Sequence, residues 1–492
     1  MWLDRFKHPG EFFGLVLAAF LLGIAAHSIR PFAHWPDVWL AAGLGFCVIG
    51  LRAAKSGLRR RSLVLLAAII AGALRFNLTV PLPEQGLLPY IGESAMLRGR
   101  IVSSTEANGR IAAVAKIEAV GANVVTGPGA NLYLRPDKSV WPGSSVEFTC
   151  TLRTPGTFPS NLERRRSLAR KGIWSECSAK TSLKILAQPN AYDPLFALAK
   201  LRERITERIA SVLPPDEAAL TTGILYGDQD LTPQLKDLFQ RAGLMHLVAV
   251  SGSNVTILVD VLLVMALYVG LPRRRAFWLV SAGLLVFVGF VGFSASILRA
   301  AFMGWLAALA RELGRKAWTD RLLLAAAATL CLFNPWVLAF DVGFALSFLA
   351  TWGLLAWTPI FEKRLSVLPR ALSLRVTAAT TCGATLMTAP YLAWVFGRLS
   401  LAGLLTNILA LPLVPWAMLW GAICAAWGDW PGHLATAAPA LGFAKAIILI
   451  SKITNIAPWL SSTVPGMDFG LLAATYLAIF YLWLGLREDK VE

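Results

Sequence analysis

Apolar runs of nearly bilayer length recur along this sequence, and they constrain the fold more than any other feature. A helix that crosses a hydrocarbon core about 30 Å thick needs about 20 apolar residues. Lipid offers no partner to backbone N–H and C=O groups, so such runs fold as helices that satisfy these groups internally. Of the 492 residues, 56% are hydrophobic and 15% are charged, against about 25% charged residues in soluble domains. The sequence therefore predicts a polytopic α-helical membrane protein whose immediate partner is the lipid bilayer.

Three apolar segments form the first predicted region, the N-terminal transmembrane segments within residues 1–76. They cover residues 12–29, 38–51 and 63–76. The loop at 52–61 contains five basic residues and no acidic residue. Short loops of this kind remain in the cytoplasm, so we expect a cytoplasmic N-terminus. The third span then delivers the following residues to the outer side of the membrane.

Residues 77–190 are more polar, and their periodicity changes from that of helices to that of strands. Partly alternating patterns predict strands at 95–103, 110–120, 130–135 and 145–153, with a fifth at 172–178. Turn signals such as Trp-Pro-Gly at 141–143 separate them. Five short strands in about 100 residues suit a small barrel of the OB type, with another kind of small β-domain as the alternative. We therefore expect an inserted, extracytoplasmic OB-like β-domain.

Two cysteines end predicted strands of this domain. Cys150 lies near the end of the fourth predicted strand and Cys177 near the end of the fifth. Because an outward-facing compartment permits disulfides, we expect the two to be bonded, which would stabilise the domain by about 3 to 4 kcal/mol. The alternative is a pair of free thiols.

A basic cluster lies between these cysteines. It consists of Arg164, Arg165, Arg166, Arg170 and Lys171. Basic residues on an OB-like barrel fit a funnel for single-stranded nucleic acid. A solvated basic face or a contact with lipid headgroups accounts for them almost as well. The formal net charge of +17 has two explanations. One is basic loops on the cytoplasmic side of the membrane together with contact with anionic lipid, and the other is a polyanionic substrate.

Residues 191–245 form the third predicted region and contain amphipathic helices. Apolar residues from Leu195 to Val212 recur at helical spacing, which predicts a helix at 193–213 on the membrane or on the β-domain. A second helix is expected at 233–243, with Thr232 as its N-cap.

Residues 246–492 form the fourth predicted region, which is again apolar. Candidate spans lie at 246–269, 277–293, 297–310, 322–339, 342–357, 376–396, 401–427, 434–458 and 469–486. Basic loops at 273–275, 311–321 and 363–375 alternate as expected for inside loops. Pro412, Pro415 and Pro439 leave room for a broken or re-entrant segment near the end.

Polar residues cluster at the start of this region. If residues 246–269 form one helix, then His246, Ser253 and Asp260, spaced by seven, share a face with Thr256. Ser251 and Asn254 would lie on the neighbouring face. Such a stripe faces a bundle interior or a water-filled path, or it supplies hydrogen bonds between helices. Gly252 offers a further alternative, because it can break the helix and leave backbone groups lining a cavity.

Other polar residues in apolar segments add candidates. Arg299 and Asp341 are expected near the outer ends of their spans, where they could pair or extend to the interface. Asn407 lies between apolar residues. Ser251 with His246 also contains the minimum for nucleophilic acyl transfer, so an intramembrane serine hydrolase is an alternative function.

Several motifs in the same order resemble the ComEC family of competence DNA-uptake channels. The similar segments are LYGDQDLTPQLKDLFQRAGLMHLVAVSG at 225–252, SASILRA at 294–300, the NPW…DVGFALSF segment at 334–348, PYLAWVFGRLSLAGLLTNILALP at 390–412, and TPGTF at 154–158 with SLARKGI at 167–173. The resemblance extends from about residue 20 to residue 460, and the order of the motifs makes it specific.

The resemblance implies a channel that passes one DNA strand into the cytoplasm. The OB-fold domain would handle the strand outside, and helices of the competence region would form the pore. The positions that match family motifs, and are therefore expected to act in the channel, are Asp228, His246, Ser251, Gly252, Arg299, Asp341 and Asn407.

Two departures from the family narrow this expectation. Many members have His where this chain has Asn254, and many have a C-terminal metallo-β-lactamase-like nuclease domain. Here the His residues are 8, 27, 34, 246 and 433, without the clustering that a metal site requires. We therefore expect no metal, no cofactor and no enzymatic activity. Strand degradation would require a separate nuclease.

The expected function is import of single-stranded DNA through the bacterial inner (plasma) membrane during natural transformation. The sequence has no P-loop, so we expect a cytoplasmic motor or single-strand-binding protein as a partner, and a DNA receptor outside. The alternative is a transporter of another anionic polymer or of a lipid-linked glycan, which the basic β-domain would also fit.

Overall fold

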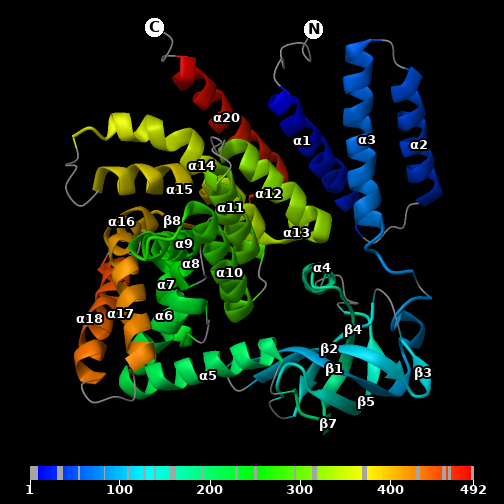
Figure 1. Cartoon of the computed structure of the whole chain (residues 1–492), viewed down its shortest axis with the longest axis horizontal. Helices are drawn as coiled ribbons and strands as arrows, with labels where there is room; N and C mark the ends of the chain where they lie inside the picture. The colour runs from blue at the N-terminus through cyan, green and yellow to red at the C-terminus, as the bar shows by residue number, and fades with distance from the viewer. Residues whose placement is uncertain are drawn as a thin grey trace. The chain divides into compact units, whose positions relative to one another are not determined.

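The structure is a computed structural model of the whole chain, and its elements are labelled in Figure 1. It describes all residues except 1–8, 30, 32–36, 54–55, 83, 108–109, 126–128, 138–139, 156–161, 191–192, 228–230, 249–251, 293–294, 313–318, 368–373, 428–432, 457–460, 464–466 and 489–492. The chain divides into two compact units. The first contains residues 1–200 and 321–342, and the second contains residues 201–320 and 343–492.

The first unit begins with three helices where three apolar segments were predicted. They are α1 (Pro9–Ser28), α2 (Asp37–Ala53) and α3 (Gly57–Asn77). Ser56 caps α3, with its side chain accepting a hydrogen bond from the Arg59 amide at 3.3 Å. The backbones of α1 and α3 approach closely at Gly23, where an added Cβ would lie 1.9 Å from the Ile69 carbonyl oxygen. Small residues at such crossings are typical of membrane helices.

Two later elements belong to the same unit, α12 (Thr319–Phe333) and α13 (Trp336–Phe340). A single span was predicted at 322–339, and that prediction is wrong. Pro335 has no backbone N–H and restricts the residue before it, so the helix ends and a new turn begins. Arg75 of α3 donates hydrogen bonds to the carbonyls of Leu332 and Phe333, the second at 2.7 Å. These are terminal carbonyls of α12 that have no partner within the helix.

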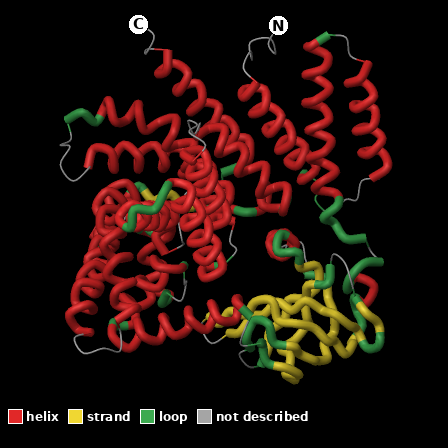
Figure 2. The backbone as a smooth tube through the Cα atoms, in the orientation of Figure 1, coloured by secondary structure: helices red, strands yellow, loops and turns green. Residues whose placement is uncertain are grey.

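The β-domain of the first unit contains all five predicted strands (Figure 2). The strands are β1 (Ser94–Ala107), β2 (Arg110–Val120), β3 (Asn123–Val124), β4 (Asn131–Pro136), β5 (Ser145–Arg153), β6 (Ile173–Thr181) and β7 (Lys184–Ala187). Their order is β1-β2-β4-β6-β5, and β5 pairs with β1, so the strands close into a ring. The β4–β6 pair is parallel, and the other pairs are antiparallel. A helix, α4 (Leu162–Ala169), lies between β5 and β6.

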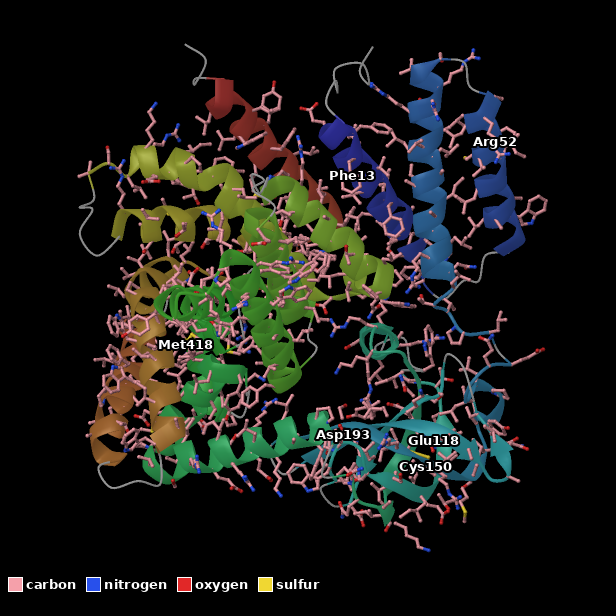
Figure 3. The ribbon with its side chains drawn as sticks, in the orientation of Figure 1. Phe13, Arg52, Glu118, Cys150, Asp193 and Met418 are labelled. Carbon is pink, nitrogen blue, oxygen red and sulfur yellow. A yellow bond between two sulfur atoms is a disulfide. The ribbon has the colours of Figure 1, made fainter. Side chains whose placement is uncertain are left out.

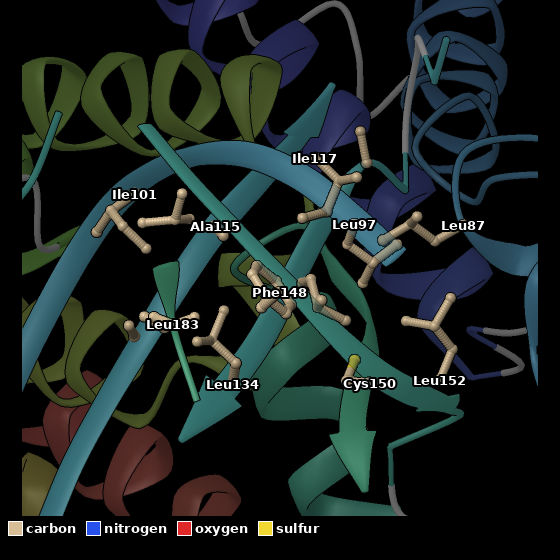
Figure 4. Close-up of a cluster of buried hydrophobic side chains, with 14 of the residues drawn as sticks. Leu87, Leu97, Ile101, Ala115, Ile117, Leu134, Phe148, Cys150, Leu152 and Leu183 are labelled. Atoms are coloured by element: carbon tan, nitrogen blue, oxygen red, sulfur yellow. The ribbon is translucent and has the colours of Figure 1, made fainter. Parts of the chain in front are cut away.

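Alternation along the strands fills the centre of this ring of strands. Leu132 and Leu134 of β4 and Leu152 of β5 are fully buried, while Tyr133 and Arg135 between and beyond them are not. The same cluster includes Leu97, Ile117 and Phe148 from β1, β2 and β5 (Figure 4). The predicted disulfide between Cys150 and Cys177 is present, with an S–S distance of 2.28 Å, and joins β5 to β6 (Figure 3).

The second unit is almost entirely helical. It contains most of α5 (Pro194–Val212), then α6 (Pro215–Tyr226), α7 (Pro233–Arg241), α8 (Met245–Val248), α9 (Gly252–Tyr268), α10 (Arg273–Val291), α11 (Ala295–Glu312), α14 (Val342–Arg364), α15 (Leu374–Phe396), α16 (Ala402–Ala410), α17 (Val414–Trp427), α18 (His433–Ser451), α19 (Ile453–Ile456) and α20 (Phe469–Glu488). A short strand pair, β8 (Arg398–Ser400) and β9 (Ser461–Thr463), lies among them.

Five helices in the described part of the chain are long and apolar enough to cross a membrane. They are Glu11–Ser28, Arg273–Val291, Val342–Arg364, Ala402–Trp427 and Phe469–Leu486. The fourth consists of α16 and α17 joined by the 3-10 turn Leu411–Leu413. Shorter apolar helices of 10–17 residues accompany them, among them Trp39–Ala53 and Asn254–Tyr268. The chain is therefore a mostly helical, multi-pass membrane protein with a small β-domain.

The segment from α6 to α8 lies in the core of the second unit. Leu220 and Ile224 of α6, Phe239 of α7 and Leu247 of α8 share one buried cluster with residues of α16, α17 and α18. Helix α6 had no counterpart in the sequence-based expectations. Its residues 220–224 are all buried, and a helix buried on every side has no amphipathic period to detect. The helix α5 before it is amphipathic as predicted, with Ile209 and Leu213 at its end buried.

Candidate functional site

The polar motif that was predicted as one helix from residue 246 consists of two helices. Helix α8 ends at Val248 and α9 begins at Gly252, so the alternative of a break at Gly252 fits the structure and the single helix at 246–269 is wrong. Asp228 and Ser251 lie outside the described residues, as does the side chain of Ser253. His246 therefore does not extend the face of α9, and the predicted stripe of seven-residue spacing is interrupted.

On α9 itself, polar residues lie on two different faces. Thr256 and Asp260, four residues apart, are exposed. Asn254 is 2% exposed, and its Nδ2 donates to the Ile224 carbonyl of α6 at 2.8 Å. Ile224 is in the last turn of α6, where carbonyls lack helical partners. Asn254 therefore links α9 to the end of α6 by a hydrogen bond. On α9, the exposed pair Thr256 and Asp260 can contact a path or lipid.

The turn between α7 and α8 packs against the start of α16. Gly243 has a φ of +67°, and an added Cβ would lie 2.9 Å from the Gly403 Cα. Thr406 donates its hydroxyl to the Ala242 carbonyl at 2.7 Å, and the Ser400 hydroxyl donates to the Arg241 carbonyl. Two motif segments more than 150 residues apart in sequence thus meet through backbone contacts.

His246 and Asn407 flank this junction in sequence. The exposed His246 ring contacts the Gly243 carbonyl through Nδ1 at 3.1 Å. Asn407 follows Thr406 on α16, and its buried Oδ1 receives no hydrogen bond from the described part of the chain. A buried, unsatisfied amide oxygen costs about 1 to 3 kcal/mol. Asn407 is thus a polar group that packing of the described residues does not explain.

Arg299 on α11 is the most buried of the candidate charges, at 4% exposure. Its guanidinium lies over the Phe348 ring of α14 at 5.5 Å from the centroid. Its apolar neighbours in α11, Ile297 and Ala300, belong to the core shared with α9 and α10. Stacking on an aromatic face compensates part of the cost of burying a cation. A charge retained inside a membrane bundle points to function. Asp341 forms an ion pair with Arg170 at 2.7 Å. Its predicted pairing with Arg299 stays a prediction.

The basic cluster of the β-domain does not form one uniform face. Arg164 pairs with Glu176 at 2.6 Å and covers the Tyr133 ring at 5.6 Å, so it lies on the outer surface of β4 and β6. Burial lowers the pKa of Arg165. Arg164 and Arg165 both belong to α4, which lies between β5 and β6 of the β-domain.

The other members of the cluster lie toward α13. Arg166 lies over the Phe340 ring at 5.2 Å, and Arg170 pairs with Asp341. Burial and the nearby Arg170 cation lower the pKa of Lys171, while Asp341 acts in the opposite direction. The sequence could not reveal these contacts, because Arg170 and Asp341 are separated by 171 positions.

Comparison with known proteins gives a consistent result. Residues 224–489, just over half of the chain, match the family model described as competence protein. The chain is 28% identical over 285 residues to ComE operon protein 3 of Bacillus subtilis (strain 168), which covers 57% of this chain and 35% of that protein. The chain thus aligns with about a third of this relative's length. No solved structure matches. As the order of its motifs indicated, the chain belongs to the competence protein family.

Proposed function

We propose that this protein is a channel that passes single-stranded DNA through the bacterial inner membrane during natural transformation. The match to the competence protein family over residues 224–489 carries the proposal, because it includes all the helices from α7 to α20. The bundle contains a buried cation, Arg299, and an exposed polar pair on α9. A DNA strand needs a path with cationic or neutral polar groups, because an apolar path would have to desolvate every phosphate.

The β-domain is an OB-type barrel in this proposal. Its ring order, with the third and fifth barrel strands (β4 and β6) parallel, supports that type. OB folds bind oligonucleotides on the face of their second and third strands and the adjoining loops. Here those strands are β2 and β4, where Lys116, Tyr133 and the overlying Arg164 supply cations and one aromatic ring. Bases stack on aromatic side chains with little sequence preference.

The β-domain lies outside the cytoplasm in this proposal, where it meets the strand first. The cytoplasmic loop at 52–61 and the single following helix α3 support this orientation, and so does the disulfide, since such bonds persist in oxidising compartments. A receptor outside, a separate nuclease, and a cytoplasmic motor or single-strand-binding protein would complete the system.

The alternative substrate is another anionic polymer or a lipid-linked glycan, which would use the same positive groups. Transformation frequency in a clean deletion strain, with and without a plasmid copy, separates the two. We expect the deletion to abolish transformation and the plasmid to restore it. Normal transformation by the deletion strain would contradict the proposal and favour the alternative substrate.

A further inference from the structure

Arg170 lies in the turn after α4. Its side chain and its backbone carbonyl both bind residues in or next to α13. Its side chain pairs with Asp341 at 2.7 Å and donates to the Phe340 carbonyl at 3.4 Å. Its own carbonyl accepts a hydrogen bond from Asn334 Nδ2 at 2.8 Å. The side chains of Arg170 and Asp341 are 24% and 14% exposed, respectively. Partly buried, hydrogen-bonded pairs are stronger than the exposed pairs that contribute little.

Aromatic contacts join the same two segments. Trp174 of β6 meets Trp336 of α13 edge to face, with ring centroids 5.4 Å apart. Arg166 of α4 stacks on Phe340. Trp336 is 2% exposed and also contacts Phe76 of α3 at 4.9 Å. The β-domain thus meets α13 through two aromatic groups as well as through the ion pair.

The α13 segment is itself fixed to the N-terminal helices. Arg75 holds the end of α12 through the Leu332 and Phe333 carbonyls, as described above. Trp336 Nε1 donates to the Thr79 hydroxyl at 3.0 Å, and the Trp336 amide donates to Asn334 Oδ1 at 3.2 Å. The Trp336 indole and amide, the Asn334 side chain and the Arg75 guanidinium therefore each have a defined partner. The segment is a preorganised surface, which lowers the entropy lost when another element docks on it.

We propose that residues 334–341, which we name the seat, are the docking surface for this chain's own β-domain, and that Arg170 is the positioning residue that sets the orientation of the barrel. The NPW…D motif then orients the barrel and does not line the pore. Asp341 directly precedes α14 in the chain. The effect on transport rests on the proposed function, whereas the docking itself does not.

The ion pair can be tested in the full-length protein in nanodiscs by hydrogen exchange of peptides from residues 330–342 and 166–181. We expect Arg170→Leu and Asp341→Leu each to raise exchange in both segments by about tenfold, because an unpaired partly buried charge destabilises the docked state. The double variant Arg170→Asp with Asp341→Arg should restore slow exchange. Arg98→Leu, which removes the exposed pair with Glu147 elsewhere on the barrel, is the matched control and should leave both segments unchanged.

The positioning role has its own readout. The leucine variants should retain the Cys150–Cys177 disulfide on non-reducing gels yet transform at least about tenfold less well. The Asp341→Leu variant, which leaves every basic residue of the β-domain in place, should bind a labelled oligo(dT) strand within about twofold of the wild type. The charge-swapped double variant should recover transformation. Unchanged hydrogen exchange in both leucine variants would overturn the seat. Faster exchange with normal transformation would overturn the positioning role. If the wild-type protein does not bind oligo(dT), this result would instead count against the proposed substrate. It would not affect the conclusion drawn from hydrogen exchange.

Discussion

Arg299 and Asp260 place opposite charges in the apolar helices of the second unit, in different surroundings. Arg299 is buried against Phe348, and Asp260 is exposed on α9. A guanidinium is weakly hydrated and stacks on aromatic faces, so it tolerates burial better than an ammonium group. A passing phosphate backbone is attracted by the first charge and repelled by the second. The two residues should therefore respond differently to neutralisation.

Replacing the buried cation should impair uptake. We expect Arg299→Leu to insert normally and to lower transformation by about 100-fold, because the bundle loses its attraction for phosphate. Arg299→Lys keeps the charge but loses the planar stack on Phe348, so its effect should be intermediate. Transformation frequency, normalised to the amount of protein in the membrane, measures both. An Arg299→Leu strain that transforms as well as the wild type would remove Arg299 from the path.

Asp260 tests what the exposed face of α9 contacts. If this face lines a wet path, Asp260→Asn should keep uptake, because the amide remains hydrated and no longer repels phosphate. Asp260→Leu should impair it by making the lining apolar at that level. Transformation and the thermal stability of the purified variants are the measurements. If the face instead contacts lipid, the leucine variant will be at least as stable as the wild type and will transform normally, which would refute the lining role.

At the scale of elements, short helices meet by backbone contact where two motifs join. The α7–α8 turn and α16 approach at Gly243 and Gly403, and Thr406 supplies a hydrogen bond across the junction. The positive φ of Gly243 is unfavourable for a residue with a side chain, and the close approach of Gly403 leaves no space for one. The junction fixes the position of α8, and with it His246.

The two glycines of this junction form a matched pair for mutation. Gly243→Ala should lower stability by about 2 kcal/mol or more, because it combines a positive φ with a contact too close for a Cβ. Gly403→Ala places its Cβ 3.5 Å from the Gly243 Cα, an ordinary contact, and it improves helix propensity, so stability should change by less than about 1 kcal/mol. Thermal unfolding in detergent compares them. Equal effects of the two substitutions would contradict the packing described here.

What the sequence could predict at this scale depended on local pattern. The alternation Val146, Phe148, Cys150, Leu152 identified β5, and apolar length identified the N-terminal helices. Helix α6 escaped because it is buried all round and has no period. The stripe from His246 to Asp260 assumed one helix, and the break before Gly252 invalidated that assumption. The role of Arg170 could not be predicted from local sequence, because its partner Asp341 comes close only in the folded chain.

At the scale of the whole molecule, the division into units does not follow the family match. Residues 321–342 lie within the matched region 224–489 but pack in the first unit, with the N-terminal helices and the β-domain. The β-domain therefore has contacts with a part of the competence region even though it lies outside the match. These contacts are the ones on which the proposed seat depends.

The disulfide reports on the compartment of the β-domain. We expect Cys150 and Cys177 to resist thiol labelling in intact cells until a reductant is added, and Cys150→Ser to destabilise the domain by about 3 to 4 kcal/mol through lost constraint on the 27-residue loop. The single variant Cys47→Ser, at a buried free cysteine of α2, controls for general thiol effects. Labelling of both cysteines without reductant would place the domain in a reducing compartment and contradict the topology.

The most direct measurement of the central claim is transport by the purified protein alone. Vesicles containing the protein, with a single-strand-binding protein trapped inside, would be given labelled single-stranded DNA and then external nuclease. We expect nuclease-protected single strands inside, at levels well above those of protein-free vesicles, and no protection of double-stranded DNA. Protection no greater than in protein-free vesicles, or equal protection of a sulfated polysaccharide, would contradict a channel for single-stranded DNA.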